Sequence, residues 1–311
     1  MILCIGTTPA AQRVMVFGKL EQNGVNRARA TFDGAAGKSI NVAKVLATLG
    51  ARPVATGFAG GTRGRELLEL VSSKGIEVDF VKVGADTRQC ISVLDESART
   101  VTELVEESKP VPDVEYASLM RIIQKHLPGC AAAVMSGSLT PGGPVDFYRR
   151  ITQQANQAGK LSVVDTQGPP LVEALAAEPG LVKPNLRELA ATVQKQLERE
   201  SDVIAAMREL QKRGAVRVVV TAGKLPTLAL ANNRLWRIQP PEIPVVNPIG
   251  SGDAFTAALV WRLVEKEELG EACRWAAAAG AANALSVMPG DLDRQEVERL
   301  LPKVKVESLW R

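Results

Sequence analysis

A run of small residues at positions 247–253 is the part of the sequence that most clearly points to chemistry. It reads Asn-Pro-Ile-Gly-Ser-Gly-Asp, and a helical pattern follows over 254–264. Small residues before a helix leave backbone N–H groups free, and the helix N-terminus adds partial positive charge, so the segment predicts an anion site. Asp253 lies within it, where a carboxylate could accept an alcohol proton while the amides hold a moving phosphoryl group. An aspartate in the first turn of an ordinary capped helix is the alternative interpretation.

Polar residues also follow four short apolar runs in the second half of the chain. The runs are 131–135, 161–164, 181–182 and 216–220. Apolar runs that alternate with helical patterns are typical of βα units in a parallel sheet, whose ligands bind beyond the carboxyl ends of the strands. The residues that we expect to share this edge of the sheet are Ser136, Ser138, Asp165, Lys183, Asn185, Thr221 and Gly223.

The first hundred residues show a different pattern. A helix is predicted over 36–50, with Gly50 as its stop. Strand-like pieces without helical partners lie around it, at 13–17, 26–32, 80–83, 89–94 and 101–105. They predict a small antiparallel sheet, built from about 10–33 and 86–106, that would serve as a lid or as a dimer surface.

Composition limits the classes of function. The chain has 311 residues, of which 46% are hydrophobic and 23% charged, as in ordinary folded globular proteins. Lys and Arg total 38 against 34 Asp and Glu, and this +4 balance is too small and too evenly spread for a nucleic-acid groove. No stretch is apolar enough to span a membrane, and the first residues do not read as a signal peptide. We therefore expect a cytoplasmic protein with neither a nucleic-acid nor a membrane partner.

Individual residues exclude three familiar kinds of site. The four cysteines lie far apart without a C-x-x-C pair, so a zinc site is not expected. His126 is the only histidine and ends a helix-like run before Pro128, which argues against Ser-His-Asp and Cys-His mechanisms. The segment 34–39, Gly-Ala-Ala-Gly-Lys-Ser, looks like a P-loop, but Phe32 stands where that motif requires a glycine.

The order of the motifs resembles that of the pfkB (ribokinase-like) carbohydrate kinases, in the branch of 1-phosphofructokinase and tagatose-6-phosphate kinase. Gly250-Ser-Gly-Asp is similar to the family's G-A-G-D signature, with Ser251 in place of alanine. Blocks in the family's order also occur at 24–27, 36–46, 57–61, 87–88, 102–104, 136–139 and 183–189. The resemblance covers most of the chain. It implies one domain over 1–311, with a three-layer α/β/α fold, a mostly parallel central sheet and a small β-sheet lid.

The resemblance also implies roles for individual residues. Asp253 would be the base that activates a primary hydroxyl, and the amides of Gly250, Ser251 and Gly252 would form the anion hole. A cofactor group would bind ATP and Mg²⁺, the metal through water on Asn185 and Glu188; it comprises Lys183, Asn185, Glu188, Thr221, Gly223 and Asn283. An acceptor group would bind the sugar and its existing phosphate; it comprises Gln12, Arg27, Gly37, Lys38, Asn41, Arg88 and Ser138.

Besides Ser251, four residues depart from the family pattern. Gln12 replaces an aspartate that contacts sugar hydroxyls, and an amide presents a different, uncharged hydrogen-bonding pattern to the sugar. Ala36 and Ser39 replace glycines, and their Cβ atoms would restrict the backbone or narrow the acceptor pocket. Pro226 replaces a glycine of the nucleotide loop and removes an N–H group.

The predicted function is Mg²⁺- and ATP-dependent transfer of the γ-phosphoryl group to a primary hydroxyl of a phosphorylated ketohexose, of the fructose 1-phosphate or tagatose 6-phosphate type. The resemblance further implies a homodimer joined through the lid. Two alternatives stay open. One is a kinase of an unphosphorylated sugar or nucleoside on the same fold, and the other is a non-catalytic protein that binds sugar phosphates.

Overall fold

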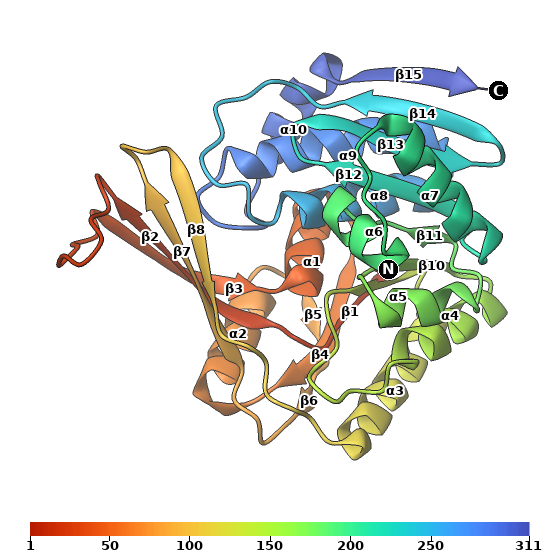
Figure 1. The fold of residues 1–311 in the computed structure, drawn as a ribbon. Helices are drawn as coiled ribbons and strands as arrows, with labels where there is room; N and C mark the ends of the chain where they lie inside the picture. The colour runs from red at the N-terminus through yellow and green to blue at the C-terminus, as the bar shows by residue number, and fades with distance from the viewer. Residues whose placement is uncertain (311) are drawn as a thin grey trace.

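The structure, a computed structural model, describes residues 1–310 and contains two β-sheets (Figure 1). The large sheet has 11 strands in the order β15-β14-β13-β12-β11-β10-β9-β1-β4-β5, with β6 beside β4. Its centre, from β4 to β12, is parallel, and β12 to β15 pair in antiparallel fashion. The strands are β1 (Ile2–Gly6), β4 (Pro53–Ala59), β5 (Glu77–Val78), β6 (Val81–Lys82), β9 (Ala132–Ser136), β10 (Leu161–Asp165), β11 (Leu181–Val182), β12 (Arg217–Ala222), β13 (Leu225–Ala231), β14 (Arg234–Gln239) and β15 (Lys305–Trp310).

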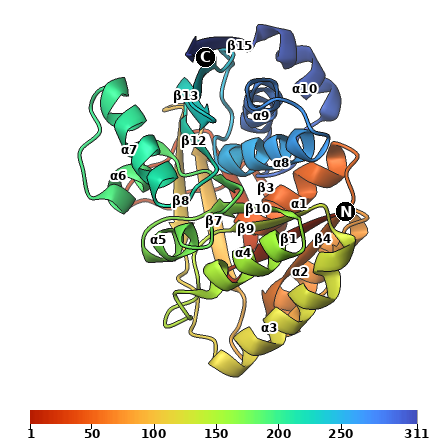
Figure 2. The same ribbon diagram turned by 90° about the vertical axis from the view of Figure 1, so that its right-hand side faces the viewer.

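Helices cover both faces of this sheet and give three layers. In Figure 2, α1 and α8 lie on one side of β9 and β10, and α4 lies on the other. One face carries α1 (Lys38–Thr48), α2 (Gly61–Ser73), α8 (Ser251–Val264), α9 (Leu269–Ala284) and α10 (Arg294–Leu300). The other carries α3 (Asp113–His126), α4 (Phe147–Gln157), α5 (Pro169–Leu175), α6 (Leu186–Val193) and α7 (Glu200–Lys212). No helix within residues 1–310 has the length and apolar character needed to cross a bilayer.

The two cores follow from the alternation of side chains along the strands. In β1, Ile2 and Cys4 belong to the core on the α1 side, and Leu3 and Ile5 to the core on the α4 side. The predicted three-layer α/β fold is confirmed, and the four apolar runs form β9, β10, β11 and β12. The helix predicted over 36–50 is α1, and α3 ends at His126, as predicted.

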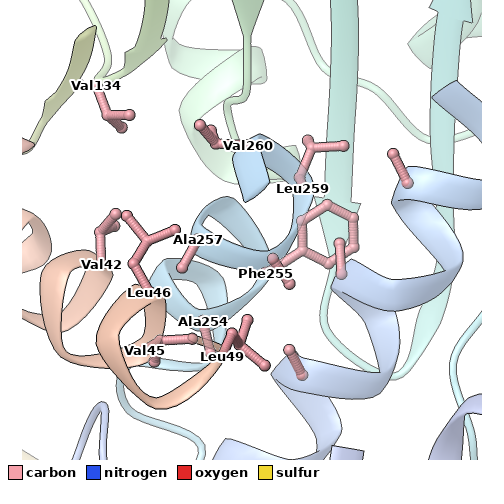
Figure 3. Packing of buried hydrophobic residues seen from close by; sticks show 14 of the residues in the cluster. Val42, Val45, Leu46, Leu49, Val134, Ala254, Phe255, Ala257, Leu259 and Val260 are labelled. Atoms are coloured by element: carbon pink, nitrogen blue, oxygen red, sulfur yellow. The ribbon is translucent and has the colours of Figure 1, made fainter. Parts of the chain in front are cut away.

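Close packing of small residues fixes the position of α8. Figure 3 shows Leu46 of α1, and Leu49 directly after it, facing Ala257 and Ala254 of α8, and all four side chains are buried. On the α9 side of α8, a Cβ on Gly280 would lie 3.1 Å from the carbonyl oxygen of Ser251. These close approaches hold the N-terminus of α8 at the edge of the sheet.

A 4-stranded sheet, called here the small sheet, projects from this body (Figure 1). Its order is β3 (Ala30–Ala36), β2 (Ala10–Phe17), β7 (Arg88–Asp95), β8 (Thr100–Val105). The prediction of an antiparallel sheet is wrong for one pair, because β2 and β7 are parallel. The chain leaves the small sheet through α1, β4 and α2, and therefore re-enters it at the end where β2 begins.

Two of the predicted lid strands also need correction. Residues 80–83 do not join the small sheet, because Val81 and Lys82 form β6, which pairs with β4 of the large sheet. The strand predicted over 26–32 begins only at Ala30, and it continues past 33 to Ala36, directly before α1.

The packing of α1 predicts a difference between two leucine truncations. Leu46→Ala removes a fully buried side chain between α1 and α8, and should lower the free energy of unfolding by about 3 kcal/mol because a cavity remains. Leu70→Ala is the matched control, because Leu70 of α2 is 42% exposed and its loss should change stability by less than about 1 kcal/mol. Urea denaturation measures both values. Equal losses would show that α1 is not packed as described.

Candidate active site

The first turn of α8 carries the predicted anion site. Gly250 precedes the helix with a φ of 83°, a left-handed conformation that glycine adopts without steric cost. The N–H of Ser251 donates to the carbonyl of Pro248 (3.2 Å), whereas the N–H groups of Gly250 and Gly252 donate to no backbone carbonyl within residues 1–310. Unpaired N–H groups at a helix N-terminus attract an anion. Lys183 adds positive charge there, since its Nζ would lie 4.0 Å from a Cβ on Gly252.

Asp253 is a buried carboxylate in the same turn. Its side chain is oriented by Asn41 of α1, whose Nδ2 donates to Asp253 Oδ2 at 2.8 Å. Burial raises the pKa of Asp253 from its ordinary 3.8 to about 6, against the attraction of Lys38, and Asp165 adds to the rise. A carboxyl that loses its proton just below neutral pH is suited to act as a general base at neutral pH.

Next to it, Asp165 at the end of β10 binds two lysines. Its Oδ1 accepts from Lys38 Nζ at 3.1 Å, and its Oδ2 lies 3.3 Å from Lys183 Nζ. Although burial favours the neutral acid, Lys183 and Lys38 lower the pKa of Asp165 to about 2. Thr256 of α8 donates to Asp165 Oδ2 at 2.6 Å and to the carbonyl of Gly252 at 3.0 Å. The charge network is therefore attached to the helix that carries Asp253.

Lys38 also reaches the predicted cofactor group. Its Nζ donates to Glu188 Oε1 at 3.0 Å, and although burial opposes its charge, Asp165 and Glu188 raise the pKa of Lys38. Sequence reasoning placed Lys38 with the acceptor group alone; the structure places its ammonium between Asp165 and Glu188. Asp165 was predicted at this edge but given no role, and Thr256 was not singled out. The polar residue directly after an apolar run was the signal available for Asp165.

Asn185 and Glu188 form a reciprocal cap at the start of α6. The N–H of Glu188 donates to Asn185 Oδ1 at 2.9 Å, and the N–H of Asn185 donates to Glu188 Oε2 at 2.8 Å. Asn185 thus precedes the helix as its cap, and the cap holds it against Glu188 of the first turn. The backbone of Asn185 also pairs with that of Thr221, so these three predicted residues are neighbours.

Gly223 and Pro226 lie in the hairpin that joins β12 to β13. Gly223 has a φ of 62°, and Ala222 pairs with Leu225 across the turn. The pairing register shifts between Val220 and Ala222, which interrupts the ladder beside Pro226. A proline is tolerated at such an irregularity because its missing N–H breaks no ladder bond. The hairpin therefore accommodates the residue that departs from the family pattern.

Asn283 of α9 supports the anion site from behind. It is fully buried, and its Nδ2 donates to the carbonyl of Ile249 (2.9 Å) and to Ser251 Oγ (3.2 Å). Its Oδ1 accepts from the N–H of Gly290 at 2.7 Å. With both amide donors used in this way, Asn283 holds the 249–251 loop, and direct contact with a nucleotide stays a prediction.

Most of the acceptor group gathers around Thr8, a residue that sequence reasoning did not assign. Arg88 donates to the carbonyl of Thr8 at 3.1 Å, and Thr8 Oγ1 donates to the carbonyl of Ser138 at 3.4 Å. A Cβ on Gly137 would lie 3.7 Å from both Thr8 Oγ1 and Lys38 Cβ. A hollow beside Arg88 is lined by Thr7, Thr8, Pro9, Ser108, Lys109 and Thr140.

Glycine is required at the start of α1. Gly37 has a φ of 102°, and a Cβ there would lie 2.8 Å from Pro9 Cα. Ala36 and Ser39 are buried on either side of it, so the fold accommodates their Cβ atoms. Gln12 is buried in β2 and donates to Ser92 Oγ at 3.0 Å. Arg27 is not brought to this group: it is exposed on the connection between β2 and β3, at the outer end of the small sheet (Figure 1).

Three buried polar atoms at this edge have no hydrogen-bond partner within residues 1–310: Asn41 Oδ1, Arg88 Nε and Ser136 Oγ. Such atoms are costly unless a ligand or water satisfies them. One lies on the residue that orients Asp253, and another on the arginine predicted to bind phosphate. A polar ligand or ordered water between Asp253 and Arg88 would satisfy them.

Comparison with known proteins shows what the whole chain is similar to. The family described as pfkB family carbohydrate kinase matches residues 1–292. A tagatose-6-phosphate kinase of Staphylococcus epidermidis is 28% identical over 309 residues, 98% of this chain and 99% of that protein. The structure of phosphofructokinase-2 from Escherichia coli with potassium is 28% identical, with a TM-score of 0.89 over 97% of this chain and 98% of its own. A Thermotoga maritima structure described as a possible 1-phosphofructokinase shares the fold, with 24% identity and a TM-score of 0.92 over 99% of both chains.

Burial of Asp253 predicts that this site lowers stability at neutral pH. Because the pKa is about 6 in the folded protein and 3.8 ordinarily, ionisation favours the unfolded state as pH rises between these values. Asp253→Asn should raise the free energy of unfolding by about 3 kcal/mol at pH 7.5 and by less at pH 5. Urea denaturation at both pH values measures this.

Asp293→Asn is the control for that measurement, because Asp293 caps α10 outside the site and asparagine caps equally well. It should leave stability unchanged at both pH values. An Asp253→Asn protein that is less stable than the parent, or whose gain in the free energy of unfolding is larger at pH 5 than at pH 7.5, would contradict the raised pKa of Asp253.

Proposed function

The chain belongs to the pfkB family of carbohydrate kinases and so is a phosphotransferase with an alcohol group as acceptor, and we propose that this acceptor is a phosphorylated ketohexose. One observation carries the proposal. The buried carboxylate of Asp253 lies in the same helical turn as the unpaired amides of Gly250 and Gly252. A base and an anion site in one turn are what transfer of a phosphoryl group to an alcohol requires.

In the proposed reaction, Asp253 accepts the proton of a primary hydroxyl while that oxygen attacks the γ-phosphorus of ATP, and the bond from the γ-phosphorus to the bridging oxygen breaks to release ADP. Asn41 holds the carboxylate through Oδ2. The amides of Gly250, Ser251 and Gly252 stabilise the negative charge on the moving group, and the Ser251 amide first gives up its weak bond to Pro248. Lys183, beside Gly252, contributes a buried positive charge.

ATP and Mg²⁺ fit the chemistry of the cofactor group. Glu188 and Asp165 already converge on one cation, the ammonium of Lys38. Residues 1–310 contain no cluster of three or more His, Cys, Asp or Glu able to hold a metal. This suits Mg²⁺, which keeps water ligands and is shared with substrate phosphates. Asn185 and Glu188 would hold it through water, with Thr221, Gly223 and Asn283 on the nucleotide side. The ion would neutralise phosphate charge.

Arg88 supports a phosphorylated acceptor. Its side chain borders the hollow beside Thr8, and its Nε has no partner within residues 1–310. A guanidinium binds phosphate through paired hydrogen bonds. The relatives at 28% identity are named as a tagatose-6-phosphate kinase and a phosphofructokinase, which supports this class of acceptor. We assign the sugar to Gln12, Gly37, Lys38 and Asn41, and its phosphate to Arg88 and Ser138; Arg27, which lies away from this group, is left out of the assignment.

The small sheet would act as a lid on a single kinase domain spanning 1–311, and would also form a homodimer. Phe32, Leu104 and Val105 of this sheet are 41%, 54% and 47% exposed. Phe32 lies on one edge strand of the sheet, β3, and Leu104 and Val105 lie on the other, β8; exposed edge strands commonly pair with another chain. A tetrameric inhibited form of phosphofructokinase-2 from Escherichia coli has been solved. The homodimer is therefore proposed from the exposed residues of this chain and not from that relative. We place the enzyme in the cytoplasm, where ATP and sugar phosphates occur.

The acceptor class can be tested by measuring ADP release with ATP and Mg²⁺. Tagatose 6-phosphate, fructose 1-phosphate, fructose 6-phosphate and the free sugars are compared, and one phosphorylated ketohexose should give the highest kcat/KM.

Asp253→Asn should lower kcat by about 10³-fold or more, because loss of the base removes proton transfer. In the unaltered protein, kcat/KM should fall below about pH 6, where Asp253 becomes protonated. Asp293→Asn should behave like the unaltered protein. Turnover of no acceptor, or full activity of Asp253→Asn, would refute the assignment.

Arg88 separates the proposal from a kinase of unphosphorylated sugars. Arg88→Ala should raise KM for the phosphorylated acceptor by about 30-fold, as expected when a charged hydrogen bond to phosphate is lost, and leave KM for ATP within about twofold. Arg121→Ala, on the exposed side of α3, is the matched control. An unchanged acceptor KM in Arg88→Ala would favour the alternative with an unphosphorylated acceptor.

A further inference from the structure

Lys44 is a buried cation outside the site described above. It lies in α1, one turn after Asn41, and is 3% exposed. Its Nζ donates to the carbonyl of Ala35 at 3.1 Å and to that of Pro289 at 2.6 Å, and it lies 3.1 Å from Asp291 Oδ1. Ala35 is at the end of β3 in the small sheet, whereas Pro289 and Asp291 lie between α9 and α10. One ammonium therefore joins the base of the small sheet to the 286–291 segment.

Stability alone gives no reason for a charge at this position. Burial lowers the pKa of Lys44, although Asp291 opposes the change, so the ammonium is held at an energetic cost. Buried ion pairs are often no more stabilising than apolar side chains of similar size. Three acceptors from two separate parts of the chain nevertheless surround it. This arrangement suits a residue that fixes the relative position of the parts it connects.

The 286–291 segment touches both Gly250, before α8, and Asn41 of α1. A Cβ on Gly250 would lie 2.9 Å from Pro289 Cβ and 3.3 Å from the nitrogen of Gly290. A Cβ on Gly290 would lie 3.1 Å from Asn41 Cα and 3.2 Å from Asn41 Oδ1. The segment thus lies directly behind Gly250 of the anion site and against Asn41, which orients Asp253.

The same segment is held to its other neighbours by side chains. Asn247 donates to the carbonyl of Val287 at 2.8 Å, and Asn283 accepts from the N–H of Gly290 at 2.7 Å. On the small sheet, a Cβ on Gly34 would lie 2.5 Å from Met288 Cε. A displacement of β3 would therefore reach the segment through Met288 and through Lys44.

We propose that Lys44 is a positioning residue for phosphoryl transfer, whose ammonium fixes the 286–291 segment to β3 so that Gly250 and Asn41 are held in place when the small sheet covers the acceptor. The proposal rests on the function proposed above. Lys44 does not touch the reacting atoms, and it acts through Pro289 and Gly290. Its loss should impair the chemical step more than the binding of either substrate.

Lys44→Met tests this, because methionine fills a similar volume without the charge. It should lower kcat by about 10- to 100-fold, as for small misplacements of reacting groups, while KM for the acceptor and for ATP stays within about threefold. Lys74→Met is the matched control: Lys74 pairs with the same Asp291 at 3.1 Å but is 46% exposed, and it should retain the parent kcat. Hydrogen exchange over residues 250–256 should be faster in Lys44→Met than in Lys74→Met.

A Lys44→Met protein with a kcat within twofold of the parent overturns the proposal, as does a rise in KM without a fall in kcat. If Lys44→Met does not fold, Asp291→Asn replaces it: a fall in kcat of about 3- to 10-fold at unchanged KM supports the role, and a parent kcat overturns it. If the parent itself turns over no acceptor, the proposed function fails separately. In that case hydrogen exchange over residues 250–256 is the remaining test of the positioning role, and equal exchange rates in Lys44→Met and Lys74→Met overturn it.

Discussion

The site is organised around a carboxylate that cannot be left unpaired. Asp165 is fully buried, and an ionised carboxylate away from water is tolerated only when cations and hydrogen-bond donors surround it. Lys38, Lys183 and Thr256 meet that requirement, and they come from α1, from the segment after β11 and from α8. The contacts that satisfy the charge of Asp165 therefore hold together three parts of the chain that are far apart in the sequence. The first turn of α8 cannot move away from the sheet without breaking the bond from Thr256.

The same lysines give two neighbouring aspartates opposite properties. Asp165 has its partners in direct contact, which lowers its pKa and keeps it charged. Asp253 is also buried, but within residues 1–310 its carboxylate has a single direct side-chain partner, Asn41, so burial dominates and raises its pKa. Two carboxyl groups whose pKa values lie this far apart supply one permanent charge and one group that exchanges a proton near neutral pH. The two aspartates differ because Lys38 and Lys183 contact the carboxylate of Asp165 and not that of Asp253.

Local patterns in the sequence were enough to predict the 250–253 turn and the alternation of strands and helices. The small residues before α8 leave its first backbone N–H groups free, and this can be read from a few neighbouring positions. The apolar runs are recognisable because both faces of their strands are buried. Contacts between distant residues were not predictable in this way. Whether Lys38 meets Asp165 and Glu188 depends on how three strands are ordered in the sheet. The parallel pairing of β2 with β7 likewise depends on the path through α1, β4 and α2, which no local pattern records.

That parallel pairing also constrains the order in which the protein can fold. The two hairpins of the small sheet, β2–β3 and β7–β8, form from local contacts, but they join only after the chain between them has packed. Pairings between distant segments form late, because the intervening loop must first lose its freedom. The segment α1, β4 and α2 therefore has to pack before the two hairpins can join. The small sheet is therefore not a unit that can fold by itself, because its central pairing of β2 with β7 depends on the packing of α1, β4 and α2 against the large sheet.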